Sequence, residues 1–191
     1  MTFLIAGILI FFGVHLVRVA APTWRERMVA RLGPGPWRGL YSVVSIAGFI
    51  LLLMGYGRVK DAGGVLWTPP DGARLVAAAA MLPAFILLVA TYVPGRIRGT
   101  VRHPMLLATL IWSSAHLLTN GALADVLLFG SFLAWAAVVT ADAWRRTDAA
   151  PPPSLPAGRA NDLIAVIVGA ALWLALVAGG HRWLFGAPIL A

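Results

Sequence analysis

Apolar residues occur along the chain in blocks, each close to the length of a membrane-spanning helix. The six blocks cover residues 2–20, 39–57, 73–93, 104–120, 122–142 and 161–181. A helix needs about 20 mostly apolar residues to cross the roughly 30 Å hydrocarbon core of a bilayer. The pattern therefore predicts an all-α fold, a polytopic membrane helix bundle with about six transmembrane helices.

Turn-forming residues divide the predicted helices from one another. Pro104 suits the first turn of the fourth helix, where its missing N–H has no hydrogen bond to lose. The short run Thr119-Asn120-Gly121 leaves room only for a tight turn, so the fourth and fifth helices are predicted to form a hairpin. We expect a membrane domain of five helices over residues 1–142, a Pro-rich cytoplasmic linker over 143–160, and a sixth helix with its tail over 161–191.

Basic residues are distributed unequally between the predicted connections. Five arginines lie within residues 18–38, three within 96–102 and three within 145–159, all in connections that would share one side of the membrane. The opposite side has only Arg58, Lys60, Arg74 and Arg182. Because short cytoplasmic connections are enriched in Lys and Arg, both termini are predicted to lie outside the cytoplasm.

Composition supports this class and excludes others. The chain has 191 residues, of which 60% are hydrophobic and 12% charged, whereas soluble domains are typically about 45–50% apolar and 25% charged. No cysteine is present, which excludes thiolate ligands, cysteine nucleophiles and disulfides. The net charge of +8 lies in short connections that face lipid headgroups, so we expect lipid contact and no nucleic-acid binding.

Two histidines within apolar blocks are candidates for chemistry. His15 lies near the cytoplasmic end of the first helix, and His116 lies well inside the fourth. Either could simply form an interhelical hydrogen bond, which is a common use of polar side chains in membrane bundles. Alternatively, two neutral imidazoles from different helices can bind a haem iron axially inside a bundle.

The residues around His15 and His116 affect the haem hypothesis in opposite ways. Arg18 follows His15 by three residues, on the same helical face, where it could pair with a haem propionate. The helical rise puts His15 roughly 5–8 Å and His116 roughly 15–18 Å from the cytoplasmic boundary. That difference requires a tilted haem, tilted helices or a different pairing of ligands.

A basic segment precedes the fourth helix. It includes Arg98, Arg102 and His103, and it could bind phosphate, carboxylate or a haem propionate at a helix start. The alternative is that these residues only contact lipid phosphates. His181, after the sixth helix, is predicted to lie at the interface without a chemical role.

Several motifs of residues 1–140 resemble the NnrU family, in order and with similar spacing. They are Phe11-Phe12-Gly13-Val14-His15, Tyr41-Ser42-Val43-Val44-Ser45, Tyr56-Gly57-Arg58, Leu66-Trp67-Thr68-Pro69-Pro70, Met81-Leu82-Pro83-Ala84-Phe85, Pro94-Gly95-Arg96-Ile97, Arg102-His103-Pro104 and Ala115-His116-Leu117-Leu118-Thr119-Asn120-Gly121. The resemblance implies a role linked to nitrite and nitric oxide reduction in denitrifying bacteria, in catalysis or in assembly with respiratory partner proteins.

The same domain resembles plant zeta-carotene isomerase, a haem b membrane enzyme that acts on a lipophilic carotenoid. That resemblance implies haem b with His15 and His116 as the iron ligands and a lipophilic substrate. Ser113 stands where the isomerase has a cysteine implicated in redox-dependent ligand exchange. A weaker resemblance, through Arg102-His103-Pro104, is to membrane methyltransferases that use S-adenosylmethionine, but their acidic cofactor-binding segment has no clear counterpart here.

Overall fold

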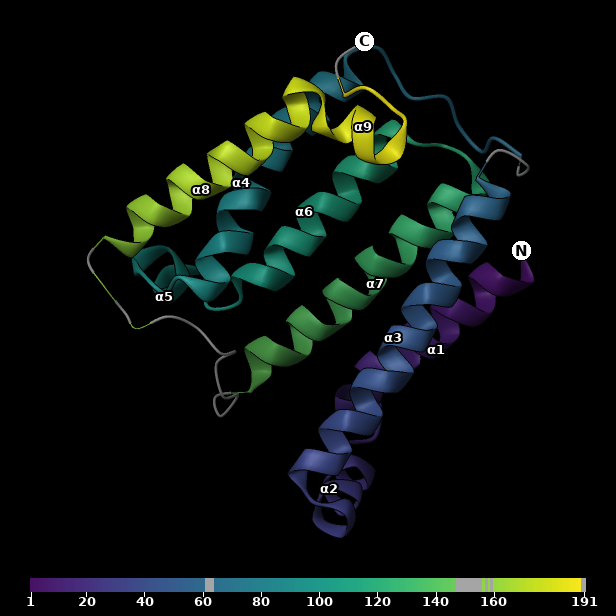
Figure 1. Ribbon diagram of the computed structural model, residues 1–191, viewed down its shortest axis with the longest axis vertical. Coiled ribbons are helices and arrows are strands. Elements are labelled where there is room, and N and C mark those ends of the chain that lie inside the picture. Colours follow the sequence, from purple (N-terminus) through teal and green to yellow (C-terminus); the bar gives the residue numbers. More distant parts are fainter. Residues whose placement is uncertain (61–63, 147–155, 157, 159, 190–191) are drawn as a thin grey trace. The chain divides into compact units, whose positions relative to one another are not determined.

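The computed structural model describes residues 1–60, 64–146, 156, 158 and 160–189, and regular structure in them is helical apart from an isolated bridge between Val65 and Ala122. Figure 1 shows the order of the elements. The helices are α1 (Thr2–Ala20), α2 (Pro22–Leu32), α3 (Pro34–Val59), α4 (Ala73–Tyr92), α5 (Arg96–Val101), α6 (Pro104–Thr119), α7 (Leu123–Arg145), α8 (Asn161–Ala175), the π-helical segment η1 (Leu176–Gly180) and α9 (His181–Phe185).

Five helical stretches among the described residues are long and apolar enough to cross a membrane. They are Thr2–Ala20, Pro34–Val59, Ala73–Tyr92, Leu123–Arg145 and Asn161–Phe185. The apolar helix α6 is shorter, at 16 residues, which corresponds to about 24 Å of helical rise. The predicted class, a polytopic helical membrane bundle, is confirmed.

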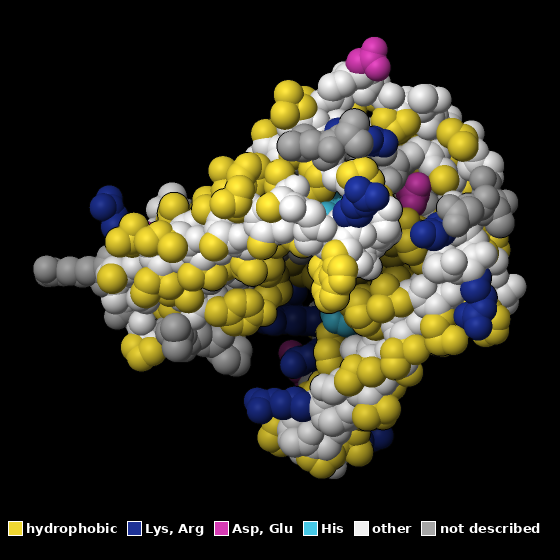
Figure 2. Space-filling model, turned by 45° about the horizontal axis from the view of Figure 1, so that its top comes forward, with side chains coloured by type: hydrophobic (Ala, Val, Ile, Leu, Met, Phe, Trp, Pro, Cys, Tyr) yellow, Lys and Arg dark blue, Asp and Glu magenta, His cyan; other side chains and the backbone are white. Residues whose placement is uncertain are grey.

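Large apolar side chains are exposed along these helices. Leu9, Val43, Leu75 and Leu163, one from each of four spanning stretches, expose between 62% and 67% of their surface. Figure 2 shows hydrophobic side chains spread over the visible outer faces of the helices. In water such surfaces would drive aggregation, whereas in a bilayer they contact lipid chains at no cost.

The chain divides into two compact units, and the first comprises Met1–Trp67 and Gly121–Ser131. Its main contact is between α1 and α3, which run side by side (Figure 1). Small residues permit this close approach: a Cβ atom on Gly48 would lie 2.7 Å from the Phe11 backbone nitrogen. Since lipid offers no hydrophobic driving force between helices, such backbone proximity supplies the packing energy.

The connection between α1 and α3 is helical, which sequence periodicity did not predict. α2 occupies residues that were expected to be a basic connection, and α3 begins at Pro34 instead of near residue 39. Gly33, with φ of 82°, makes the turn between the two helices. Pro34 and Pro36 are compatible with helix because they lie in its first turn, where backbone N–H groups have no helical partner.

The second unit comprises Thr68–Asn120 and Phe132–Ala191. In it, α4 contacts α6 on one side and α8 on another (Figure 1). The Trp173 indole N–H donates to the Ala78 carbonyl over 2.7 Å, and Gly169 lies against the backbone of Ile86. Pro104 is the first residue of α6, as its position in the sequence predicted.

The last predicted connection is only partly described. α7 continues to Arg145, so the first three residues of the predicted linker, 143–145, are helical. The proline-rich run at 151–153, most of the remaining linker and Arg159 lie outside the described residues. The final helix is present at Asn161–Ala175, as expected from the apolar block at 161–181.

Candidate functional site

His15 has a defined orientation on α1 in the first unit. Its Nδ1 lies 2.6 Å from the carbonyl oxygen of Phe11, one turn earlier. Because a carbonyl oxygen only accepts hydrogen bonds, Nδ1 carries the hydrogen and donates it, and the Nε2 atom of the neutral ring has the lone pair. The centre of the imidazole ring lies 4.2 Å from the centre of the Phe11 ring and 5.4 Å from the centre of the Tyr41 ring.

A cavity of about 550 Å³ adjoins His15. Its walls come from α1, α2 and α3, and three of its residues are arginines, one from each helix: Arg18, Arg25 and Arg38. The remaining lining residues are Val14, Val17, Val29, Pro34, Trp37, Tyr41 and Ser42. The cavity therefore combines an imidazole and three guanidinium groups with an apolar and aromatic wall.

The helical connection α2 is what completes this cavity. Arg25 and Val29 line it from α2, four residues apart and thus on one helical face. The Trp24 and Trp37 rings contact each other with centres 5.9 Å apart, which fastens α2 to the start of α3. Arg18 was predicted to accompany His15, whereas the positions of Arg25 and Arg38 depend on the turn at Gly33.

His116 has the same local geometry as His15, on α6 in the second unit. Its Nδ1 lies 2.8 Å from the Trp112 carbonyl oxygen, so Nδ1 donates and Nε2 is the basic nitrogen. The Trp112 ring contacts two other rings: its centre lies 5.0 Å from that of His116 and 5.1 Å from that of Phe132. Phe132 belongs to α7, so this ring contact links α6 to the part of α7 that lies in the second unit.

Ser113, on α6 three residues before His116, is fully buried. Its hydroxyl group donates to the Thr109 carbonyl at 2.7 Å and lies 3.2 Å from the Leu110 carbonyl. Such a back-bonded hydroxyl satisfies its polar group within its own helix. Serine has no thiolate chemistry, and this geometry gives it a local structural role.

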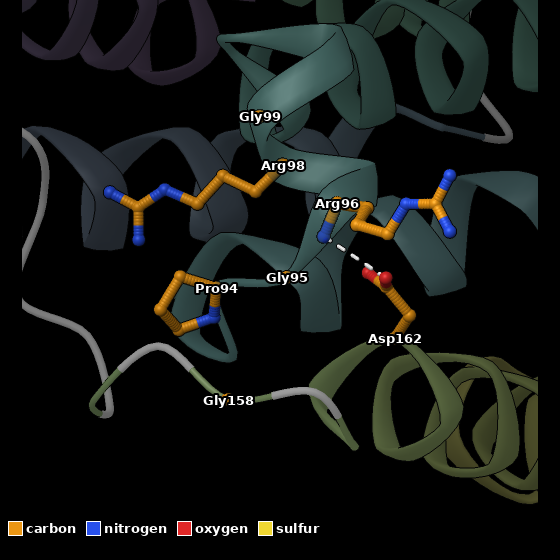
Figure 3. Close-up of a pocket in the computed structure, with 7 residues that line it drawn as sticks. All are labelled: Pro94, Gly95, Arg96, Arg98, Gly99, Gly158 and Asp162. Carbon is orange, nitrogen blue, oxygen red and sulfur yellow. Dashed lines mark hydrogen bonds between the residues drawn. The ribbon is translucent and has the colours of Figure 1, made fainter.

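The basic segment before α6 adjoins a second cavity, of about 890 Å³, in the second unit. Pro94, Gly95, Arg96, Arg98, Gly99, Gly158 and Asp162 line it. Figure 3 shows the Arg96 and Arg98 side chains extending in opposite directions. The Arg98 guanidinium donates to the Thr91 carbonyl over 3.0 Å.

A carboxylate of the chain itself occupies the start of α5. The Asp162 oxygens accept hydrogen bonds from the backbone N–H groups of Arg96 and Ile97, both over 3.0 Å (Figure 3). A Cβ atom on Gly95 would lie 2.7 Å from the carboxyl carbon of Asp162, so glycine makes room for it. Arg102, with φ of 61°, and His103, which precedes α6, belong to the turn between α5 and α6 and are not among the lining residues.

Replacing Asp162 by alanine should destabilise the second unit by about 1–2 kcal/mol, because two helix-terminal N–H groups lose their acceptor. The measurement is thermal unfolding in detergent, followed by circular dichroism. Asp71→Ala is the control, since Asp71 is exposed in a connection. Equal stability of the two variants would contradict the capping role.

Asp125 lies in the first turn of α7 and is buried in the first unit. The residue is 8% exposed, accepts a hydrogen bond of 2.6 Å from the Tyr56 hydroxyl, and accepts another of 3.2 Å from the Ala122 N–H. The Ala122 contact is local and follows from an aspartate at a helix start. Tyr56 is 69 residues away in the sequence, so nothing local indicated it.

Comparison with known proteins gives the family. A model of the family described as NnrU protein matches residues 3–189. The chain belongs to the NnrU family. The resemblance seen in the motifs of residues 1–140 is thus confirmed, and the family match also covers the last helices, which contain no distinctive motif. A search of the curated proteins and a search of the solved structures gave no match.

His15 and His116 of this NnrU-family protein lie in different units, and each is presented by its own helix in the same way. Among the described residues, no group of three or more His, Cys, Asp or Glu side chains is arranged to hold a metal ion.

Proposed function

We propose that this NnrU-family membrane protein binds haem b, and that His15 and His116 would hold its iron. The observation that carries the proposal is the cavity at His15, where an imidazole of defined tautomer stands beside three guanidinium groups and an apolar wall. When bound, haem supplies an iron centre for one-electron or Lewis-acid chemistry.

The hydrogen bonds of the two histidines suit metal binding. A metal-ligating histidine almost always donates its other ring N–H to a carbonyl or carboxylate, which fixes the ring and raises its basicity. Nδ1 of His15 and Nδ1 of His116 each donate to a carbonyl one turn earlier, at 2.6 and 2.8 Å. In both rings Nε2 is the nitrogen that would bind iron.

The arginines suit the two propionates of haem. Guanidinium groups form bidentate, charge-assisted hydrogen bonds with carboxylates. Arg18, Arg25 and Arg38 would neutralise the propionates at the edge of the membrane, while the valines and Trp37 would contact the macrocycle. The binding of an anionic group by Arg98, Arg102 and His103 stays a prediction.

The biological role that follows is a haem-dependent step in a bacterial inner membrane, with both termini outside the cytoplasm. Two substrates fit the proposal: a lipophilic molecule that reaches the haem from the bilayer, or a nitrogen oxide in respiration with partner proteins. Exposed apolar helices allow direct access from lipid, which favours the lipophilic substrate.

The test is the spectrum of the protein purified after expression with ample haem. We expect a Soret band, about one haem per chain, and a reduced-minus-oxidised spectrum typical of two axial imidazoles. Arg18→Gln should weaken haem retention about tenfold, the effect of one lost charge-assisted hydrogen bond. Arg58→Gln is the control, because Arg58 lies at the other end of the first unit's helices and contacts Phe3.

Protein without a Soret band under these conditions would overturn the haem proposal. In that case, binding of S-adenosylmethionine in calorimetry, lost in Arg102→Ala, would indicate a methyltransferase. Co-purification with a respiratory complex, without either cofactor, would indicate an assembly factor.

A further inference from the structure

His181 is held in place by the segments on both sides of it. The chain leaves α8 through the π-helical segment Leu176–Gly180, in which Gly179 has a φ of 129°. After α9 a second turn, at Gly186 with φ of 77°, brings the Ala187 carbonyl to 2.7 Å from His181 Nδ1. The bend at Gly179 and the turn at Gly186 thus fix the course of the chain on both sides of His181.

The neighbour of His181 in the second unit is His116. Their ring centres are 6.5 Å apart, with an angle of 38° between the planes. Nδ1 of His181 faces a carbonyl oxygen, as Nδ1 of His116 does, so it also donates and leaves the lone pair on Nε2. Two imidazoles of the same tautomer thus lie together, 65 residues apart in the sequence.

The separation of these rings selects among metal geometries. A ligating nitrogen lies about 2 Å from a metal ion, and the ring centre about 1 Å beyond it, so trans imidazoles have centres about 6 Å apart and tetrahedral ones about 5 Å. The observed 6.5 Å is close to the trans value. This distance is compatible with an iron ion between the two rings, and the described residues hold no group of three or more possible ligands of the kind that a tetrahedral zinc site uses.

We propose that His181 is a third iron-binding imidazole, which takes the coordination position opposite His116 when His15 does not occupy it. This inference rests on the proposed haem function. His15 and His116 are predicted to lie at different depths in the membrane, which makes it difficult for them to share one iron. His181 lies next to His116, so this second pair does not have that difficulty. His116 is then the ligand common to both pairings.

The test uses the full-length protein with haem and compares three variants. His15→Ala should keep the low-spin, six-coordinate ferric spectrum, because His181 replaces the missing ligand. The double variant His15→Ala/His181→Ala should become high-spin, as judged by electron paramagnetic resonance and the visible spectrum. The matched control, His15→Ala/Trp183→Ala, removes an exposed ring from the same helix as His181 and should stay low-spin. Added imidazole should restore the low-spin signal to His15→Ala/His181→Ala, which shows that this variant keeps its fold.

Two outcomes would overturn the inference while leaving haem binding intact: a high-spin spectrum in His15→Ala itself, or a low-spin spectrum in His15→Ala/His181→Ala. A wild-type protein that holds no haem would instead overturn the proposed function and this inference together. Stacking of two neutral rings without a metal predicts that the His181 substitution leaves the haem spectrum of every variant unchanged.

Discussion

His116→Ala is expected to lower the haem content of the purified protein at least tenfold. Substitutions that only disturb the partner of a metal ligand already cost about 10–100-fold in affinity, and loss of the ligand itself should cost no less. His116 is also the member that the two proposed ligand pairs share. The measurement is haem per chain, from the pyridine haemochrome and the protein concentration.

The control for this variant is Leu118→Ala, which truncates an exposed side chain on the same helix, two residues after His116. It should keep the wild-type haem content. A second variant separates ligand loss from misfolding: His116→Gly leaves a space where added imidazole should restore the Soret band. An unchanged Soret band and haem content in His116→Ala would contradict the assignment of His116 as a ligand.

Gly55→Ala is expected to destabilise the first unit by about 3 kcal/mol, at the upper end of the range for overpacking. A Cβ atom at Gly55 would overlap the backbone of Leu4 and lie 2.7 Å from the Phe3 carbonyl carbon. Backbone atoms cannot rotate away as a side chain does, so α1 and α3 must separate. The measurement is unfolding in mixed micelles with increasing denaturing detergent.

Gly57→Ala in the same helix is the matched control. No atom lies within 4 Å of the position that its Cβ would take. Alanine has a higher helix propensity than glycine, by about 1 kcal/mol in water, so this variant should be neutral or slightly stabilised. The two substitutions are chemically identical and two residues apart, and an equal effect of both would contradict the proposed α1–α3 packing.

The spanning helices could be predicted because their cause is local. Each block of apolar residues favours lipid over water by itself, and a helix satisfies its backbone hydrogen bonds within four residues. Pro104 marked the start of α6 for an equally local reason. The extension of α3 to Pro34 and the formation of α2 could not be predicted in this way, because prolines and glycines there also suit a turn.

The candidate functional residues divide in the same way, into those that the local sequence indicates and those that only the fold brings together. The sequence alone selected His15 and His116, since an ionisable group in an apolar block is expensive and therefore noticeable. His181 lies at the end of such a block beside Arg182, where polar residues are ordinary, and it was predicted to have no chemical role. Its contact with His116 depends on the path of the chain through Gly179 and Gly186.

The sequence by itself determined the class of protein, the apolar helices and the family, and it indicated two of the three histidines that we propose as iron ligands. Only the tertiary structure decided which groups meet: Asp162 with the start of α5, Tyr56 with Asp125, Arg25 with the cavity at His15, and His181 with His116. The physical reason is the distance along the sequence over which each kind of interaction acts. Hydropathy and helical hydrogen bonds act between near neighbours in the sequence, whereas these contacts join residues brought together by helix packing and by turns whose direction a few glycines set.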